Sequence, residues 1–351
     1  MTVILLLGLG GCGGSSGTTS VPVTSAKNRI NSHAIVFTEM AEATKDALTE
    51  AASTSHSGMI RMDLTWASLQ PSAPPAPYDW HWADESIRSA KKNNLGILAL
   101  IAETPAWASS HPNDPSFRSY PPAADHWDEW EAFITAFVDR YGVKGTNEIR
   151  HWEIWGEAND DGQWLGTPAE YAQLYARAYN AIKRSDPGAE VLMAGLNESK
   201  MPDWLDAVLN DPTYPARDKI DIIDVHIRGS FDHVKELAAG AKELFRLQGV
   251  KDKAIWVTEF GFPSSPAFQN RPEWDPHFAG LNASDGEQKQ ADYYDTVIPW
   301  LLTEGGIDKL FVTLRDLDTP NLPWESEGIM TQAGTPKIAF GTIKTLSDRF
   351  Q

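Results

Sequence analysis

The 351-residue sequence contains one cysteine, Cys12, so it cannot form an internal disulfide or a cysteine-based zinc cluster. Basic residues are also outnumbered: the sequence has 30 Lys and Arg against 48 Asp and Glu, which gives a formal net charge of -18. Such a chain is repelled overall by nucleic acid and by anionic membrane surfaces, so no nucleic-acid partner is expected and a neutral one is favoured. Beyond the N-terminal stretch no run of about 18 apolar residues occurs, and no membrane-spanning helix is predicted.

The first thirty residues differ in composition from the rest of the chain. Residues 3–25 read "VILLLGLGGCGGSSGTTSVPVTS", an apolar run that ends at Cys12 and passes into a Gly/Ser/Thr-rich tether over residues 13–30. The pattern resembles the lipobox of bacterial lipoproteins. It implies a signal over residues 1–12, lipidation of Cys12 and export to the cell envelope, with the lipid as the only link to a membrane. No Lys or Arg precedes the run, and an ordinary export signal, leaving the protein periplasmic or secreted, is the alternative.

The same stretch contains the glycine spacing of a dinucleotide-binding loop, Gly8-x-Gly10-x-x-Gly13. That loop requires a helix opening at the third glycine and an acidic residue about 20 positions later. Here the tether follows, and no acidic residue occurs before Glu39. No cofactor is therefore expected.

From about residue 31 the chain alternates between short apolar segments and longer helical patterns, and its 42% hydrophobic content is enough for a sizeable core. One helix is expected from Thr167 to about Arg184, because Thr167 and Glu170 form a capping box with Pro168 at the first helical position. Another capping box opens at 284–287, and a last helical stretch covers 336–350. The predicted strands span residues 33–40, 58–64, 95–103, 149–157, 190–196, 220–227, 254–262 and 309–314.

Apolar strands that are each followed by a helix indicate a parallel sheet covered on both faces. Eight such units predict an α/β fold, a single-domain (β/α)8 TIM barrel over residues 31–351. A doubly wound open sheet is the alternative, but no phosphate-binding glycine loop supports it. In a barrel the working residues lie at the C-terminal ends of the strands.

Two glutamates, Glu157 and Glu259, stand at predicted strand ends after apolar runs. Each could instead be a buried structural partner of an inward arginine such as Arg61 or Arg315. Two such residues in tryptophan-rich surroundings favour a functional role. Because strand residues alternate between faces, Glu153 shares the lumen with Glu157 but lies deeper, and we expect it to pair with Arg61.

Several segments resemble clan A glycoside hydrolases, nearest to families 39 and 5. "HWEIWGEAN" resembles their strand-four motif and "WVTEFGF" is similar to their strand-seven motif. The likeness covers residues 33–350 and includes "RMDLTWASLQP", "ETPAWA", "DVHIRG", "LRDLD" and "EGIMTQAGTPKIAF". The resemblance implies that Glu157 is the general acid/base and Glu259 the nucleophile.

These roles have physical requirements. Retaining hydrolysis needs two carboxyl groups about 5–5.5 Å apart, one neutral and one ionised. We expect burial near Trp155 to keep Glu157 protonated, and positive or hydrogen-bonding neighbours to keep Glu259 ionised.

Two positions depart from the family pattern. Gly156 replaces the Asn that precedes the acid/base. Either it permits a bulge that re-aims Glu157, with Asn159 or another group reaching the sugar 2-hydroxyl, or the subsite does not grip that hydroxyl. Arg228 replaces the Tyr of the strand-six His-x-Tyr pattern, and it either lowers the pKa of Glu259 through charge or points outward.

Flat aromatic faces are what sugar-binding clefts require, and the sequence has 14 tryptophans. Trp256 is expected to pack against the helices, because its parity opposes that of Glu259. The loop residues expected as platforms, each with a loop anchor as the alternative, are Trp107, Trp155, Trp164, Trp274 and Trp324.

Arg61 and His226 are further binding candidates, whereas we expect His33, His81 and His151 to be structural. Asp316 and Asp318 lack further ligand spacing, so no metal site is predicted.

The sequence therefore predicts an exported, monomeric, retaining glycoside hydrolase that acts on a neutral oligo- or polysaccharide. A transglycosylase and a carbohydrate-binding barrel without catalysis are the alternatives. Retention of both glutamates argues against the second, because a binding cleft has no need of the pair.

Overall fold

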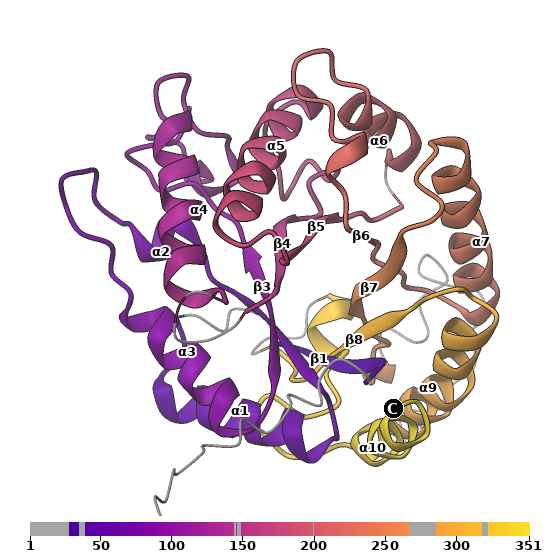
Figure 1. Cartoon of the computed structure of the whole chain (residues 1–351). Helices are drawn as coiled ribbons and strands as arrows, with labels where there is room; N and C mark the ends of the chain where they lie inside the picture. Colours follow the sequence, from indigo (N-terminus) through magenta and orange to yellow (C-terminus); the bar gives the residue numbers. More distant parts are fainter. Residues whose placement is uncertain are drawn as a thin grey trace, which may run out of the picture.

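Eight parallel strands close into a barrel in the order β1 to β8, with β1 paired to β8 (Figure 1). The computed structural model describes residues 28–34, 39–143, 145, 149–198, 200–266, 286–317 and 322–351. The predicted TIM barrel is confirmed. Its strands are β1 Ile30–Ala34, β2 Met59–Asp63, β3 Gly96–Ile101, β4 His151–Gly156, β5 Glu190–Gly195, β6 Ile222–Asp224, β7 Ala254–Phe260 and β8 Lys309–Thr313.

Helices form a ring around the strands in Figure 1, and the C-terminal helix α10 packs against α9 and also contacts β1. The helices are α1 Glu42–Thr54, α2 Trp66–Leu69, α3 His81–Lys92, α4 Trp127–Tyr141, α5 Pro168–Ser185, α6 Met201–Leu209, α7 Phe231–Leu247, α9 Gly286–Thr303 and α10 Ile338–Arg349. Short 3-10 turns are η2 Phe117–Ser119, η3 Arg217–Lys219 and η5 Pro323–Ser326.

The capping box of α5 is formed as predicted. The Thr167 hydroxyl accepts from the Glu170 N–H at 3.2 Å, and the Glu170 carboxylate accepts from the Thr167 N–H at 2.7 Å. This box satisfies two of the N–H groups that a helix N-terminus leaves without partners.

The first strand begins earlier than the predicted 33–40, at Ile30. Its polar residues are buried because β2 and the residues just before it offer them partners. Asn31 accepts from the Met59 N–H at 3.0 Å, and the Ser32 hydroxyl lies 2.8 Å from that of Ser57. A search for apolar runs passes over such a strand.

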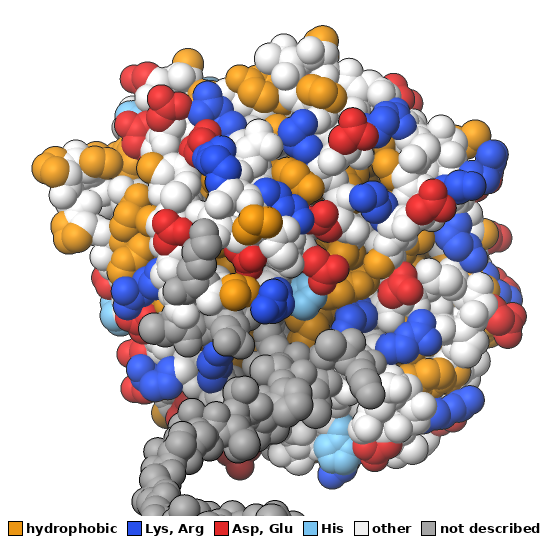
Figure 2. All heavy atoms as spheres, in the orientation of Figure 1, with side chains coloured by type: hydrophobic (Ala, Val, Ile, Leu, Met, Phe, Trp, Pro, Cys, Tyr) orange, Lys and Arg blue, Asp and Glu red, His pale blue; other side chains and the backbone are white. Residues whose placement is uncertain are grey.

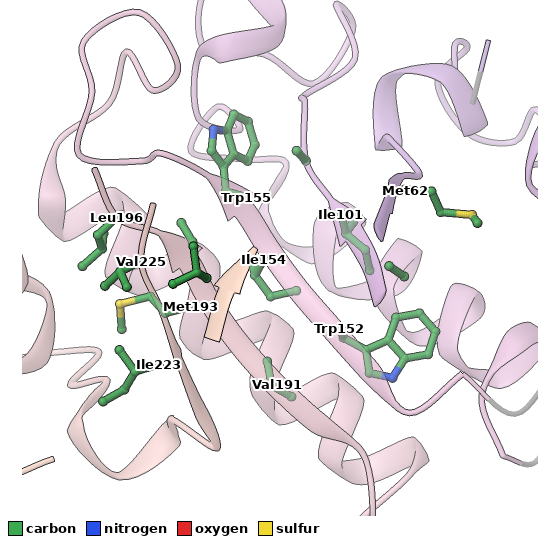
Figure 3. Close-up of a cluster of buried hydrophobic side chains, with 14 of the residues drawn as sticks. Met62, Ile101, Trp152, Ile154, Trp155, Val191, Met193, Leu196, Ile223 and Val225 are labelled. Atoms are coloured by element: carbon green, nitrogen blue, oxygen red, sulfur yellow. The ribbon is translucent and has the colours of Figure 1, made fainter. Parts of the chain in front are cut away.

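The outer face of the barrel is apolar and packs on the helices. Figure 3 shows Trp152 and Ile154 of β4 together with Val191 and Met193 of β5 in one cluster of buried side chains. Trp152 also contacts Phe137 of α4, with ring centroids 5.7 Å apart. Alternation along the strands therefore leaves the other face to the interior of the barrel.

The prediction for Trp256 is wrong. Trp256 packs inside the barrel, in a small cluster of strand residues, and its ring centroid lies 5.8 Å from that of Phe311. The register of β7 with β8 shifts between Val257 and Phe260, so parity is not continuous along β7. Both Trp256 and Glu259 can therefore face inward.

On the face drawn in Figure 2, Lys and Arg side chains are interspersed among Asp and Glu, although the net charge is -18. Among the described residues, no helix combines the length and the apolar character needed to cross a membrane.

Candidate active site

A cleft of about 750 Å³ lies at the carboxyl ends of the strands. Both predicted glutamates line it, as expected for a TIM-barrel site: Glu157 directly follows β4, and Glu259 is the next-to-last residue of β7. Of the other predicted residues it contains Arg61, Trp155, His226, Arg228 and Trp324.

Glu259 of β7 is held by two arginines. Its Oε1 accepts from Arg61 Nη1 at 2.9 Å, and its Oε2 accepts from Arg228 Nη2 at 3.0 Å. Burial alone would raise the pKa of Glu259, but the positive charges of His226, Arg61 and Arg228 hold that pKa well below its ordinary value. The geometry therefore gives an ionised carboxylate at this strand end, and Arg228 points inward rather than outward.

Glu157 follows β4 in an uncommon backbone conformation, with φ of 45°, and its N–H donates to the Gly195 carbonyl at 3.0 Å. Its Oε1 lies 2.7 Å from His226 Nδ1, which lies 3.7 Å from Glu259 Oε2. One oxygen of Glu157 and one of Glu259 are within 4.8 Å of each other. His226 thus stands beside both carboxylates.

The expectation that burial keeps Glu157 protonated is wrong for the site without a substrate. Burial does act to raise the pKa of Glu157, but the hydrogen bond and charge of His226 outweigh it, and the pKa lies below its ordinary value. The pKa of His226 is raised, because Glu259 and Glu157 together outweigh the effect of its burial. The exchangeable proton therefore rests on His226, 2.7 Å from Glu157 Oε1.

A second layer of charged residues forms the floor of the cleft and extends below it. Arg61 is 1% exposed and donates to both oxygens of the fully buried Glu153 at 2.6 Å, so the predicted pair is confirmed. Arg61 Nη1 also donates to His33 Nε2 at 2.8 Å, and His33 lines the cleft. His33, which we expected to be purely structural, thus helps to fix the guanidinium that holds Glu259.

Glu327 was not identified from the sequence. This carboxylate is 3% exposed and accepts from Arg228 Nε at 3.1 Å, so it holds the guanidinium against Glu259. A Cβ on Gly261 would lie 2.2 Å from Glu327 Oε2, so glycine at that position makes room for the carboxylate. The only sequence signal was its place in the closing segment "EGIMTQAGTPKIAF".

The predicted platforms divide into two groups. Trp324 is 38% exposed in the cleft, and Trp155 lines it with its indole N–H donating to the Gln163 carbonyl at 3.1 Å. Trp164 packs edge-on against Trp155 and donates to the Thr167 carbonyl, so it supports the loop. Trp107 donates to the Gln70 carbonyl at 2.8 Å and does not line the cleft.

Asn159 is also away from the cleft lining. Its side-chain amide donates to the Asn197 carbonyl at 2.9 Å, and it is 2% exposed. Trp274 and Cys12 lie outside the described residues. The polar lining residues that sequence reasoning missed are Asp63, Thr65, Glu103, Arg118, Ser119, Asp160, Gln163, Asn197 and Glu198.

Two groups of described residues bring ligand atoms within metal-binding distance of one another. They are Glu153, Asp224 and His226, and Glu157, His226 and Glu259. Arg61 and Arg228 already compensate the charge of Glu153 and Glu259. The arrangement suits acid–base and nucleophilic chemistry by carboxylates better than it suits cation binding.

The barrel and its mouth define a class of protein, a TIM-barrel enzyme with two carboxylates at the ends of β4 and β7. Residues 125–334, more than half of the chain, match the family described as "Glycosyl hydrolase catalytic core". The chain therefore belongs to this family of glycosyl hydrolase catalytic cores. The comparison with curated proteins found no match.

Solved structures share the fold at low sequence identity. A family 39 glycoside hydrolase from Bacteroides cellulosilyticus WH2 has a TM-score of 0.66 and 16% identity, over 92% of this chain and 64% of that one. A monomeric beta-xylosidase from Caulobacter crescentus CB15 has a TM-score of 0.68 and 17% identity, over 92% and 68%. GH5_18 from Streptomyces cattleya, in complex with GlcNAc, has a TM-score of 0.65 and 15% identity, over 92% and 80%. The chain spans less than two thirds of the first of these.

Proposed function

We propose that the protein is a retaining glycoside hydrolase in which Glu259 is the nucleophile and Glu157 the general acid/base. The observation that carries the proposal is the proximity of the two carboxylates, with one oxygen of each within 4.8 Å. This separation suits direct attack on the anomeric carbon rather than attack by an intervening water, for which the carboxyl groups are about 6.5–9.5 Å apart.

In the first step Glu259 attacks the anomeric carbon while Glu157 gives a proton to the leaving oxygen. His226 Nδ1 lies 2.7 Å from Glu157 Oε1 and can return its proton to that carboxylate. Once Glu259 is bound as an ester its charge is gone, and that charge is one of the influences that raise the pKa of Glu157. Its loss favours the ionised Glu157 that must accept a proton from water in the second step.

A neutral glycan is the substrate class that the cleft lining favours. Carboxylates that line it, besides Glu157 and Glu259, include Asp160, Glu198 and Glu103, the last of which is paired with Arg118 at 2.7 Å; the unbalanced carboxylates would repel an anionic sugar. Structurally similar proteins include a beta-xylosidase, an exo-beta-1,4-mannosidase and a glucosidase. We therefore propose xylosides, mannosides and glucosides as the first substrates to examine.

The test is a time course on a panel of aryl glycosides and oligosaccharides. Proton NMR of the first product should show the anomeric configuration of the substrate, and a 2-fluoro glycoside of the best sugar should label Glu259 in peptide mass spectra. Release of the inverted anomer first would contradict the mechanism. Product analysis also separates hydrolysis from transglycosylation, and binding without turnover would leave only the carbohydrate-binding barrel.

We also propose export with a lipid on Cys12, supported by the composition of residues 3–25. Several acyl chains, at about 0.8 kcal/mol per buried methylene, hold a protein firmly to a membrane. Bacterial expression should give a membrane-bound protein that Cys12→Ser releases or leaves misprocessed. A wild type that is soluble and cleaved away from Cys12 would favour an ordinary export signal.

A further inference from the structure

Beneath His226 a chain of buried hydrogen bonds leads away from the cleft. His226 Nε2 lies 3.2 Å from the Thr258 hydroxyl, and that hydroxyl lies 2.7 Å from Asp224 Oδ2. Asp224 Oδ1 accepts from the Thr258 N–H at 3.2 Å. None of these three residues is more than 4% exposed. The mechanism proposed above does not use Thr258 or Asp224.

The ring of His226 is fixed against β5, so its two nitrogens have fixed partners. A Cβ on Gly195 would lie 2.1 Å from His226 Nε2, and only glycine leaves room for the ring there. Nε2 therefore meets Thr258, and Nδ1 meets Glu157 at 2.7 Å.

The Thr258 hydroxyl has one hydrogen to donate, and its direction sets the proton on His226. When Thr258 donates to Asp224, its oxygen accepts from a protonated Nε2, and the single proton between Nδ1 and Glu157 can sit on either atom. When Thr258 donates to Nε2, a neutral His226 must carry its proton on Nδ1. Glu157 then has to be a carboxylate and has no proton for the leaving oxygen.

We propose that Asp224 is a positioning residue that, through Thr258, keeps His226 Nε2 protonated and so makes the neighbouring proton available to Glu157. This inference rests on the proposed function, since it assigns a supporting role in the acid step. The chain of hydrogen bonds begins at Asp224 of β6 and passes to Thr258 of β7. From there it passes to His226, which follows β6, and ends at Glu157, which follows β4.

Other charged groups surround the chain, but among the described residues the Thr258 hydroxyl hydrogen-bonds only to His226 and Asp224. Burial raises the pKa of Asp224 well above its ordinary value, helped by the charge of Glu153, so Asp224 gains a proton at a higher pH than an exposed aspartate. A protonated Asp224 donates a hydrogen bond to the Thr258 hydroxyl, and this reverses the direction of the hydrogen bonds between Asp224, Thr258 and His226. The charged and titratable groups that act on Asp224 or His226 are Glu157, Glu259, Glu153, Arg61, Arg228 and His33.

The decisive variant is Asp224→Asn, which keeps the shape of the side chain. The Thr258 N–H needs the amide oxygen as its acceptor, so the amide NH2 faces the Thr258 hydroxyl and donates to it. The chain is then fixed in the reversed direction at every pH. Thr258→Val removes the hydroxyl, and Thr258→Ser restores it.

In Asp224→Asn and Thr258→Val, kcat/KM should fall at least about tenfold for glycosides with a sugar or alkyl leaving group, but less than about threefold for dinitrophenyl glycosides, which leave without protonation. Thr258→Ser should recover most of the loss. The acid limb of the pH profile should also differ between substrates in the wild type. As the pH falls, activity toward glycosides with sugar leaving groups should be lost at a higher pH than activity toward dinitrophenyl glycosides. Thr49→Val in α1 is the matched control, because Thr49 is equally buried and its hydroxyl meets Ser89 at 2.8 Å.

Nitrogen-15 NMR of the His226 ring gives a readout that does not depend on activity. Nε2 should carry a proton in the wild type and lose it in Asp224→Asn. Equal losses with both leaving groups, unchanged kinetics in both variants, or the same ring nitrogen protonated in both proteins would each overturn the inference. A wild type that hydrolyses no member of the glycoside panel would instead overturn the proposed function, and the NMR comparison would still decide the direction of the chain.

Discussion

The two strand ends that supply the carboxylates are built differently. On β7, Glu259 meets the guanidinium groups of Arg61 and Arg228 at 2.9 and 3.0 Å. At the end of β4, Glu157 meets the ring of His226 at 2.7 Å and has a left-handed backbone with φ of 45°. Glu259 is therefore hydrogen-bonded to groups that do not titrate in the working range, and Glu157 is hydrogen-bonded to one that does, although His226 and Arg228 each lie within 4 Å of both carboxylates.

The difference separates a fixed charge from an exchangeable proton. Arginine cannot give its proton to Glu259, so this carboxylate stays ionised over a wide pH range. Histidine can give its proton to Glu157 and take it back, which is what an acid that later acts as a base requires. Both carboxylates are largely buried, but their hydrogen-bond partners differ. Glu259 is therefore kept ionised, whereas Glu157 can gain and lose a proton.

The largest effect should come from removing the fixed charge. Glu259→Gln is isosteric and should lower turnover at least about 100-fold with every leaving group, because no nucleophile remains. Initial rates on the best substrate of the panel measure this. Glu50→Gln on the exposed side of α1 is the matched control and should leave turnover unchanged. Near-native turnover of Glu259→Gln would remove Glu259 from the mechanism.

Glu157→Gln should also lower turnover at least about 100-fold on natural linkages, but the loss should shrink as the leaving group improves. Rates across a series of aryl glycosides with falling leaving-group pKa measure the dependence. If Glu157→Gln instead lost the same factor with every leaving group, as expected for Glu259→Gln, Glu157 would not be the general acid.

Arg228→Met should sharpen the comparison on the β7 side. The pKa of Glu259 is lowered, so activity that needs its ionised form is lost as the pH falls through that pKa. Without Arg228 the pKa of Glu259 rises, and the acid limb of kcat/KM should move to higher pH. Arg228→Lys keeps the charge and should move it less. An unchanged acid limb in Arg228→Met would show that Arg61 and His226 are enough to keep the pKa of Glu259 low.

The same two regions explain what the sequence could predict. Hydrophobic alternation indicates eight strand–helix units, and strand parity places Glu153 with Arg61 below Glu157. Parity fails on β7, because the irregularity between Val257 and Phe260 has no signature in "WVTEFGF".

Contacts between distant segments are the other limit. The pKa of Glu157 is set by His226, 69 residues away, and the sequence gives no distance between them. Burial alone therefore predicted the wrong direction for the site without a substrate. Arg228 and Glu327 are 99 residues apart, and their pairing is likewise fixed only when the barrel closes.

Gly156, between the two unusual residues of β4, has the smallest expected effect. The left-handed φ values belong to Trp155 and Glu157, at 69° and 45°, and not to Gly156 itself. A Cβ there would lie 3.6 Å from Arg61 Nη2 and 4.0 Å from Leu100, both ordinary contacts. The backbone therefore does not require glycine, and Gly156→Ala should change the free energy of unfolding by less than about 1 kcal/mol.

The lack of a side chain at Gly156 is therefore expected to affect how the substrate is bound. The resemblance puts an Asn at this position, contacting the sugar 2-hydroxyl, and such bonds supply several kcal/mol in the transition state. Asn159, the other amide considered, donates to the Asn197 carbonyl and is away from the cleft lining. A 2-deoxy version of the best substrate, corrected for its intrinsic reactivity, should therefore lose less than about 1.4 kcal/mol in kcat/KM, one factor of ten. A loss of several kcal/mol would mean that another group binds the 2-hydroxyl, and that Gly156 does not decide the choice of sugar.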